Sequence, residues 1–228
     1  MWAGQGLSAD GRAWAHAGAV AVACPALSRL NRLVVRGPHA ATASLVEAVV
    51  PMLASSYVVF GDADLISAVT TAVAWLAPRN EFGWMDAVSM PFGGCSRQVR
   101  WLSAREWPEV TDLLGRVFPD SHAWPAEAGV RAWAGIRDGS GSLAATAADA
   151  WSAPAAGFLA GVAVSESARG QGYGQDACRF VLKDLIAAHG RASLMVRTWN
   201  EPAIRIYRGL GMSWRLLGSA WIRREHAR

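Results

Sequence analysis

The pattern of apolar and polar positions in the first part of the chain predicts alternating strands and helices. Runs of apolar or alternating residues with β-branched content predict strands over residues 12–24, 31–36 and 57–60. A helix is predicted over residues 40–53, ending or kinking at Pro51, and a second one over 63–76 with Asp62 as its N-cap. Residues 31–90 therefore follow the order strand, helix, strand, helix, strand.

A Pro- and Gly-rich stretch at residues 90–94 interrupts this pattern and predicts a boundary between domains 1–95 and 96–228. Strands are then expected where apolar runs recur, at residues 99–102, 131–136, 142–150, 158–164, 193–196 and 212–222. Helices are expected over residues 103–117, 172–188 and 201–210, the first opened by a capping box of Ser103 and Glu106. This order predicts an α/β fold, with a mixed central sheet and helices on both faces.

Composition and charge exclude several functional classes. A chain of 228 residues with 52% hydrophobic and 18% charged residues is too apolar to be disordered, and it is long enough to bury a substantial core. The net charge is +4, and the basic residues, all arginines except Lys183, are scattered along the chain. We therefore expect no nucleic-acid partner. No apolar run reaches the length of a membrane span, so no membrane association is expected either.

Three cysteines, Cys24, Cys95 and Cys178, are odd in number and widely spaced, which fits neither a disulfide framework nor a zinc site. We expect no metal and a reducing, cytoplasmic location. The apolar residues 13–27 imitate an export signal, but His16 and Gly18 interrupt them, so strands are the preferred interpretation.

A glycine-rich loop between a predicted buried strand and a predicted helix is the main candidate for chemistry. Glycines let main-chain amides crowd inward, and the start of a helix adds unpaired N–H donors and its positive dipole end. Such a corner binds an anion, typically a phosphate or a pyrophosphate. The loop consists of Arg169, Gly170, Gln171, Gly172, Tyr173 and Gly174.

Several interpretations of this loop compete. A nucleoside-triphosphate loop is excluded because the chain has no Gly-Lys-Ser/Thr triplet. A dinucleotide fingerprint is matched formally by residues 172–177, but the next strand ends at Arg197 with no acidic residue for a ribose hydroxyl. Coenzyme A is the third ligand, and a plain turn without a ligand is the remaining alternative.

Two motifs carry a resemblance to a known family. Residues 169–174 resemble the Arg/Gln-x-x-Gly-x-Gly/Ala signature of the GNAT superfamily of N-acetyltransferases, and they stand between a strand and a long helix as in that family. Residues 200–212, from Asn200 through Tyr207 to Leu-Gly-Met, are similar to its second signature, Asn-x-x-Ala-x-x-x-Tyr followed by Leu-Gly-Phe. The resemblance covers residues 99–221, about half of the chain.

The resemblance implies acetyl-CoA as the cofactor and a role for each matching residue. The main chain of Val162, Ala163 and Val164 would pair with the pantetheine arm, and the amides of residues 169–174 would hold the pyrophosphate. Asn200 would contact the pantetheine or the phosphates. Tyr207 would protonate the leaving thiolate, and helical spacing places Ala203 on the same face as Tyr207. The alternative for Tyr207 is packing in the core.

An amine acceptor must lose a proton before it attacks the thioester, so a base is required. The candidates are Glu166 at the strand end, Asp149 on the preceding strand and His122 in a loop; each could equally be a solvated or turn residue. Glu166 is the preferred catalytic partner of Tyr207. Trp151 is a candidate for lining the acceptor site, together with His122 and Asp149.

The first half contains no glycine loop, since Arg36-Gly37-Pro38-His39 is the nearest segment and proline lacks an amide N–H. It is interpreted as a degenerate GNAT-like half that completes the acceptor groove or forms a homodimer interface. The function expected for the chain is acetyl-CoA-dependent N-acetylation of a primary amine on a small molecule or a peptide. The alternative is a protein that binds acyl-CoA without turnover, or an interaction protein.

Overall fold

The computed structural model describes residues 2–3 and 11–223. The Cα positions form two compact units. The N-terminal unit contains the described residues up to Trp84 and those from Arg215 onward, and the C-terminal unit is Met85–Trp214. The chain thus passes between the units twice, inside two strands. These units differ from the expected domains 1–95 and 96–228, because long-range strand pairing, rather than the Pro- and Gly-rich loop, decides where contacts concentrate.

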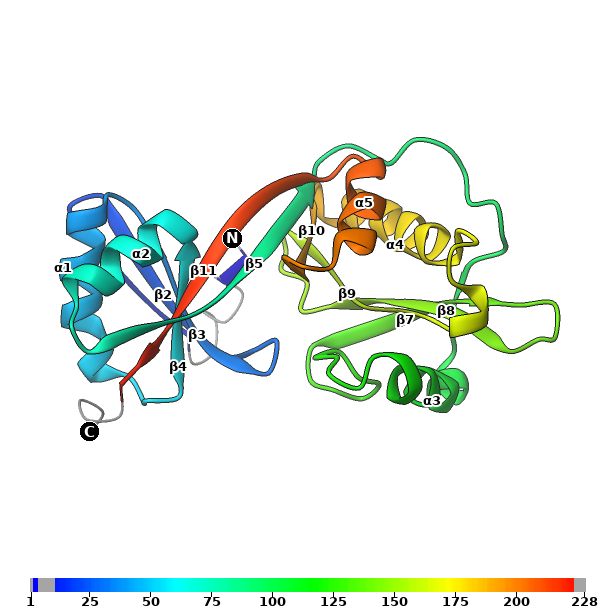
Figure 1. Ribbon diagram of the computed structural model, residues 1–228, viewed down its shortest axis with the longest axis horizontal. Helices are drawn as coiled ribbons and strands as arrows, with labels where there is room; N and C mark the ends of the chain where they lie inside the picture. The colour runs from blue at the N-terminus through cyan, green and yellow to red at the C-terminus, as the bar shows by residue number, and fades with distance from the viewer. Residues whose placement is uncertain (1, 4–10, 224–228) are drawn as a thin grey trace. The chain divides into compact units, whose positions relative to one another are not determined.

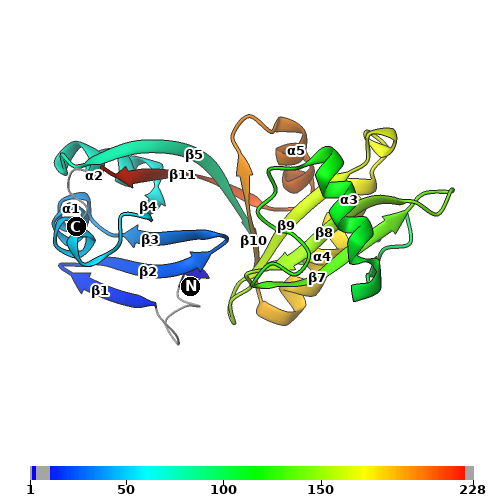
Figure 2. The ribbon, with the colours of Figure 1, turned by 90° about the horizontal axis from the view of Figure 1, so that it is seen from below.

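The N-terminal unit is a sheet with two helices. Its elements are β1 (Arg12–His16), β2 (Ala19–Leu27), β3 (Leu30–Arg36), α1 (His39–Val49), β4 (Tyr57–Asp62), α2 (Ala63–Ala72), most of β5 (Leu76–Ala87) and most of β11 (Ser213–Ile222). The strands lie in the order β1-β2-β3-β4-β11-β5 (Figure 2). The β3–β4 pair is parallel, whereas β1–β2, β2–β3 and β4–β11 are antiparallel. Apolar side chains of α1 and α2 share one core with this sheet.

The C-terminal unit is a mixed sheet with helices on both faces. Its elements are β6 (Arg100–Trp101), α3 (Trp107–Val117), β7 (Val130–Arg137), β8 (Leu143–Ala150), β9 (Gly157–Val164), α4 (Tyr173–His189), β10 (Ala192–Arg197) and α5 (Glu201–Gly209). The order is β10-β9-β8-β7-β6, with the end of β5 beside β10. Helices α4 and α5 cover one face and α3 covers the other (Figure 1). The predicted fold class is confirmed.

Local signals explain most element boundaries. Helix α1 ends at Val49, and a short 3-10 turn containing Pro51 follows it, as predicted. The capping box of Ser103 and Glu106 is present and opens a 3-10 turn that leads into α3.

Two expectations about α2 needed adjustment, whereas the preferred interpretation of residues 13–27 as strands is confirmed. Helix α2 stops at Ala72, short of the predicted residue 76, because Leu76 already begins β5. Asp62 occupies the N-cap position of α2, but its side chain makes no capping hydrogen bond. The export-like residues 13–27 form β1 and β2. Among the helices of the described residues, none combines the length and the apolar character required to cross a membrane.

Candidate functional site

Strands β9 and β10 start as a parallel pair and then separate. Their register contains only Ala192 opposite Gly157 and Ser193 opposite Phe158. The rest of β9 has no paired partner on β10 within the described residues. The pair β3–β4 in the other unit behaves differently, since it stays paired over residues 31–34 and 57–60. The C-terminal part of β9 therefore presents an edge of main-chain groups in the middle of a sheet.

The register against β8 shows which residues of β9 face this open side. The N–H of Ser165 donates to Ala144 O at 2.8 Å, and Val164 is opposite Ala145. Hydrogen-bonded and non-hydrogen-bonded pairs alternate along antiparallel strands, so the N–H and C=O of Val164 point away from β8. By the same alternation, the main-chain N–H and C=O of Val162 also point away from β8, whereas those of Ala163 point toward β8. Of the three expected pantetheine contacts, Val162 and Val164 offer free main-chain groups.

Gly161 marks a β-bulge in β9 that the sequence analysis did not single out. The register shifts between Thr146 and Ala148 opposite it, and Gly161 has φ +60°. A Cβ at Gly161 would lie 2.4 Å from the indole ring of Trp133, so only glycine fits. A glycine inside an apolar strand run is the signal that could have predicted this bulge.

The glycine loop follows β9 after a short 3-10 turn and leads into α4. Gly170 and Gly172 have φ +73° and +85°, which side-chain-bearing residues rarely adopt. A Cβ at Gly174 would lie 3.0 Å from Val164 Cγ2, so the third glycine lets α4 pack closely on β9. Gln171 Nε2 donates to Ser167 O at 2.7 Å and closes the loop with its side chain.

The main-chain N–H groups of this loop are free to bind a ligand. In the described part of the chain, those of Gly170 through Gly174 have no hydrogen-bond acceptor, and the first cap bond of α4 runs from Asp176 N to Gly172 O. Residues 169–172 are exposed. Five N–H groups without an acceptor, at the positive end of a 17-residue helix, suit an anion such as a pyrophosphate.

Arg97 is a second component of this corner that the sequence analysis missed. Its guanidinium carbon lies 4.2 Å from the ring centre of Tyr173, and its Nη1 lies 3.4 Å from the position of a Cβ on Gly172. It also forms an ion pair with Asp176 at 3.2 Å. The side chain hydrogen bonds and charge of these neighbours raise the pKa of Arg97, so it stays positive.

Asp176 anchors the loop that carries Arg97. Its buried carboxylate accepts from Ser96 N–H at 3.2 Å and from Arg179 at 3.1 Å. Farther along α4, Lys183 Nζ donates to Gly93 O at 2.7 Å. The segment 92–97 is therefore bound along the N-terminal half of α4. No motif signals this contact, because it depends on the path of a loop with no regular structure.

Helix α5 carries Asn200, Ala203 and Tyr207, the residues predicted from the second motif, and packs on the core of the C-terminal unit. Asn200 is its N-cap, and its Oδ1 accepts from Ala203 N–H at 3.3 Å, which commits the side-chain oxygen to the helix end. Tyr207 is 7% exposed and lies in one apolar cluster with Cys178, against which Val162 and Ala203 pack. Burial, with a smaller effect of Cys178, raises the pKa of Tyr207 well above its ordinary value.

The candidate bases and acceptor residues are spread over different places. Glu166 is exposed in a 3-10 turn (Glu166–Ala168) between β9 and the glycine loop. His122 is exposed next to Ala123, whose Cβ is 3.4 Å from the position of a Cβ on Gly161. Both therefore lie near the open part of β9.

Asp149 and Trp151 lie at the opposite end of β9. The Ser152 hydroxyl donates to the carboxylate of Asp149 and accepts from Phe158 N–H at 2.8 Å. Trp151 is buried, and its indole N–H donates to Ala128 O at 2.9 Å. Phe158 is separated from Val164 by about 20 Å of extended strand. The structure does not bring Asp149 or Trp151 to the glycine loop, because Asp149 binds in the turn that leads into β9 and Trp151 binds the segment that precedes β7.

Comparison with known proteins gives a match to one family. Residues 96–212, just over half of the chain, match the family described as "Acetyltransferase (GNAT) family". No curated protein matches the chain.

Solved structures with a similar fold extend over both units. A GCN5-related N-acetyltransferase from Kribbella flavida has a TM-score of 0.66 at 19% identity, covering 95% of this chain and 91% of that one. One from Sphaerobacter thermophilus has a TM-score of 0.58 at 15% identity, covering 90% and 77%. A putative acetyltransferase from Novosphingobium aromaticivorans has a TM-score of 0.56 at 16% identity, covering 96% and 93%. At these identities the likeness concerns the fold.

Proposed function

Because this chain belongs to the acetyltransferase (GNAT) family, we propose that it transfers an acetyl group from acetyl-CoA to a primary amine. The observation that carries the proposal is the separation of β9 from β10, which exposes main-chain groups of Val162 and Val164 beside the unpaired N–H groups of residues 170–174.

The residues present fit acetyl-CoA from its phosphate end to its thiol end. The glycine loop offers five N–H donors and the charge of Arg97 for the pyrophosphate. The amide-containing pantetheine arm needs donors and acceptors along an extended line, which Val162 and Val164 supply on the open edge of β9. When bound, acetyl-CoA supplies a thioester as the acetyl donor.

The main chain of β9 also provides for the charge that develops on the acetyl oxygen. The N–H of Val164 points to the open side of β9 and has no acceptor in the described part of the chain. A fixed N–H donor in a site with little water stabilises such a negative charge effectively. In this proposal Val164 is the donor.

Tyr207 is the proposed acid. Its raised pKa keeps the phenol protonated at physiological pH, so that it can donate its proton to the departing thiolate. Ala203, one turn earlier on α5, lies on the same face of the helix and packs against the same apolar cluster. Within the described residues the Tyr207 hydroxyl has no hydrogen-bond partner, which leaves it available.

Glu166 is the proposed base, with His122 as the alternative. The Glu166 carboxylate makes no ion pair or hydrogen bond with the described residues, so it is free to accept a proton from an amine. Comparing Glu166→Gln with His122→Gln separates the two: loss of the acidic limb of the pH–rate profile in only one variant identifies the base.

The experiment that tests the proposal follows free thiol release from acetyl-CoA in the presence of a panel of amines. The panel contains peptide N-termini, lysine side chains, aminoglycosides and polyamines. We expect thiol release above the hydrolysis seen without amine, together with an acetylated product of matching mass. Binding of acetyl-CoA without release by any amine would favour a sensor, and absence of binding would reject the proposal altogether.

A further inference from the structure

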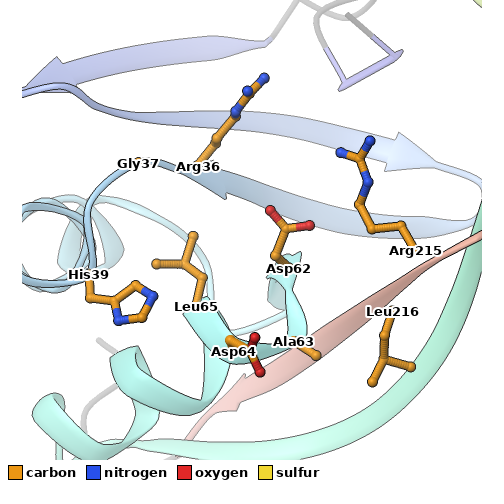
Figure 3. A pocket seen from close by; sticks show the side chains of 9 residues that line it. All are labelled: Arg36, Gly37, His39, Asp62, Ala63, Asp64, Leu65, Arg215 and Leu216. Carbon is orange, nitrogen blue, oxygen red and sulfur yellow. The ribbon is translucent and has the colours of Figure 1, made fainter.

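The N-terminal unit contains a pocket of about 650 Å³, apart from the glycine loop. It lies where the parallel strands β3 and β4 end and where α1 and α2 begin, with β11 along its rim (Figure 3). Ligands of α/β sheets bind outside the carboxyl ends of parallel strands, because the starts of the following helices face the same space. Pockets of this volume accommodate small molecules.

Charged side chains of both signs surround this pocket. Arg36 ends β3, Asp62 ends β4, Asp64 lies in the first turn of α2, and Arg215 belongs to β11. In Figure 3 the carboxylate of Asp62 lies between the side chains of Arg36 and Arg215, whereas Asp64 lies on the other side of the start of α2. Within residues 11–223 none of these four forms an ion pair or a side-chain hydrogen bond. Two guanidinium groups and two carboxylates are therefore available to a ligand.

The start of α2 adds a preference for a carboxylate on the ligand. Asp62 stands at the N-cap position but does not cap the helix, so its side chain leaves the first-turn N–H groups to other acceptors. The pocket is lined by Ala63 and Leu65 of this turn. The helix dipole and the guanidinium of Arg215 both favour an anionic group here, and planar guanidinium groups pair well with carboxylates.

The remaining walls of the pocket are apolar, and the strands β3 and β4 beside it stay paired with each other. Leu65 and Leu216 contribute aliphatic surface. Strands β3 and β4 stay paired over residues 31–34 and 57–60, so no open strand edge exists for a pantetheine arm. The pocket is thus unlike the glycine-loop site, and its chemistry suits a short molecule that carries an anion, a cation and an aliphatic part.

We propose that this pocket binds a free α-amino acid, with its carboxylate on Arg215, Arg36 and the start of α2, and its ammonium on Asp62. The inference goes beyond acetyl transfer and does not depend on it, since it concerns binding in the N-terminal unit alone.

Isothermal titration calorimetry of the full chain, without acetyl-CoA, tests this proposal. Each standard α-amino acid is titrated, and the tightest binder is compared with its N-acetyl and carboxamide derivatives. We expect each derivative to bind about tenfold more weakly, because each lacks one of the two charges that the pocket pairs. Equal binding of the derivatives, or no binding of any amino acid up to about 10 mM, would overturn the proposal.

Variants locate the binding in the pocket. We expect Arg215→Gln and Asp62→Asn each to weaken binding about tenfold, whereas Arg12→Gln and Glu47→Gln, exposed and outside the pocket, should leave it unchanged. Arg36→Gln replaces Arg215→Gln if the latter does not fold, as judged by thermal melting. Inorganic phosphate is the final probe: if it binds in an Arg215-dependent way while no amino acid does, the pocket is an anion site and the proposal is wrong.

Discussion

The guanidinium of Arg97 stacks on the ring of Tyr173, the first residue of α4, with 4.2 Å between the guanidinium carbon and the ring centre. Asp176, one turn later, holds the same guanidinium by an ion pair. A residue from the irregular segment between β5 and β6 thereby adds a fixed positive charge to the N–H groups of the glycine loop.

Replacing Arg97 with glutamine should weaken coenzyme A binding about tenfold, since one charge-assisted contact to a phosphate is lost. Calorimetry measures the affinity at low and high salt, and the wild type should lose more affinity with salt than the variant. Arg105→Gln is the matched control, because Arg105 is exposed in the same unit and distant in sequence from the loop. If both variants bind equally well, Arg97 is only a structural residue.

Gly172→Ala should lower the free energy of unfolding by about 1–2 kcal/mol and weaken coenzyme A binding, because alanine is strained at φ +85°. Its Cβ would lie in ordinary van der Waals contact with Arg97 Nη1, at 3.4 Å, so the strain comes from the main chain. Gly115→Ala is the control: this glycine lies inside α3 with no atom within 4 Å of an added Cβ, so alanine should stabilise by about 0.5–1 kcal/mol. Chemical denaturation compares them, and changes of the same sign would contradict the argument.

Tyr207→Phe should lower kcat about 100-fold and leave the KM for acetyl-CoA nearly unchanged, because only the proposed proton donor is removed while the buried ring is kept. Steady-state kinetics of thiol release measure both constants. Tyr57→Phe removes a hydroxyl from the other unit and should leave both constants unchanged. If kcat is unaltered in Tyr207→Phe, Tyr207 is not the acid, and its role is packing in the core.

The free energy of unfolding should fall in alkaline solution because the buried thiol of Cys178 resists ionisation. Burial raises the pKa of its thiol to about 12, above its ordinary value. The folded protein disfavours the thiolate, whereas the thiol of the unfolded chain ionises with a pKa near 9.0. The free energy of unfolding therefore keeps the full contribution of the neutral thiol below pH 9.0 and loses it as the pH rises toward 12. Tyr207, whose pKa burial also raises, acts in the same direction at higher pH.

The measurement is urea denaturation from pH 8 to pH 11, in about four steps. We expect Cys178→Ala to show a shallower decline above pH 9.0 than the wild type, with a loss of about 1 kcal/mol at neutral pH from the smaller side chain. Parallel declines in the two proteins would show that the Cys178 thiol does not control this loss.

A fragment of residues 96–228 should not fold stably. It lacks Met85 and Ala87, which are buried in the core of the C-terminal unit, and it leaves β11 without β4. Residues 85–214 form one compact unit and are the matched fragment, which we expect to unfold cooperatively on heating. A fragment 96–228 that melts like the intact chain would contradict this expectation.

Part of the candidate site could be predicted from sequence because its chemistry is local. The glycine loop is encoded by contiguous residues whose positive φ angles and helix start need no distant partner. Asn200 and Tyr207 are likewise placed by one short helix. The positions of Asp149 and Trp151 could not be predicted in this way. Both are near β9 in sequence, but sequence does not show at which end of the strand their side chains lie.

Other features depend on contacts between distant segments. Arg97 reaches the glycine loop only because buried Asp176 holds residues 96–97 against α4. The opening of β9 depends on β10 leaving the pair after Ser193, which no pattern in either strand indicates.

The sequence by itself determined the order of helices and strands and the glycine-rich corner before α4, because apolar periodicity, caps and positive-φ glycines act within a few residues. Only the tertiary structure decided where β9 separates from β10, which arginine joins the corner, and that β5 and β11 each belong to both units. These depend on strand pairing and burial between residues far apart in the chain, and the free energy of such contacts exists only once the core has formed.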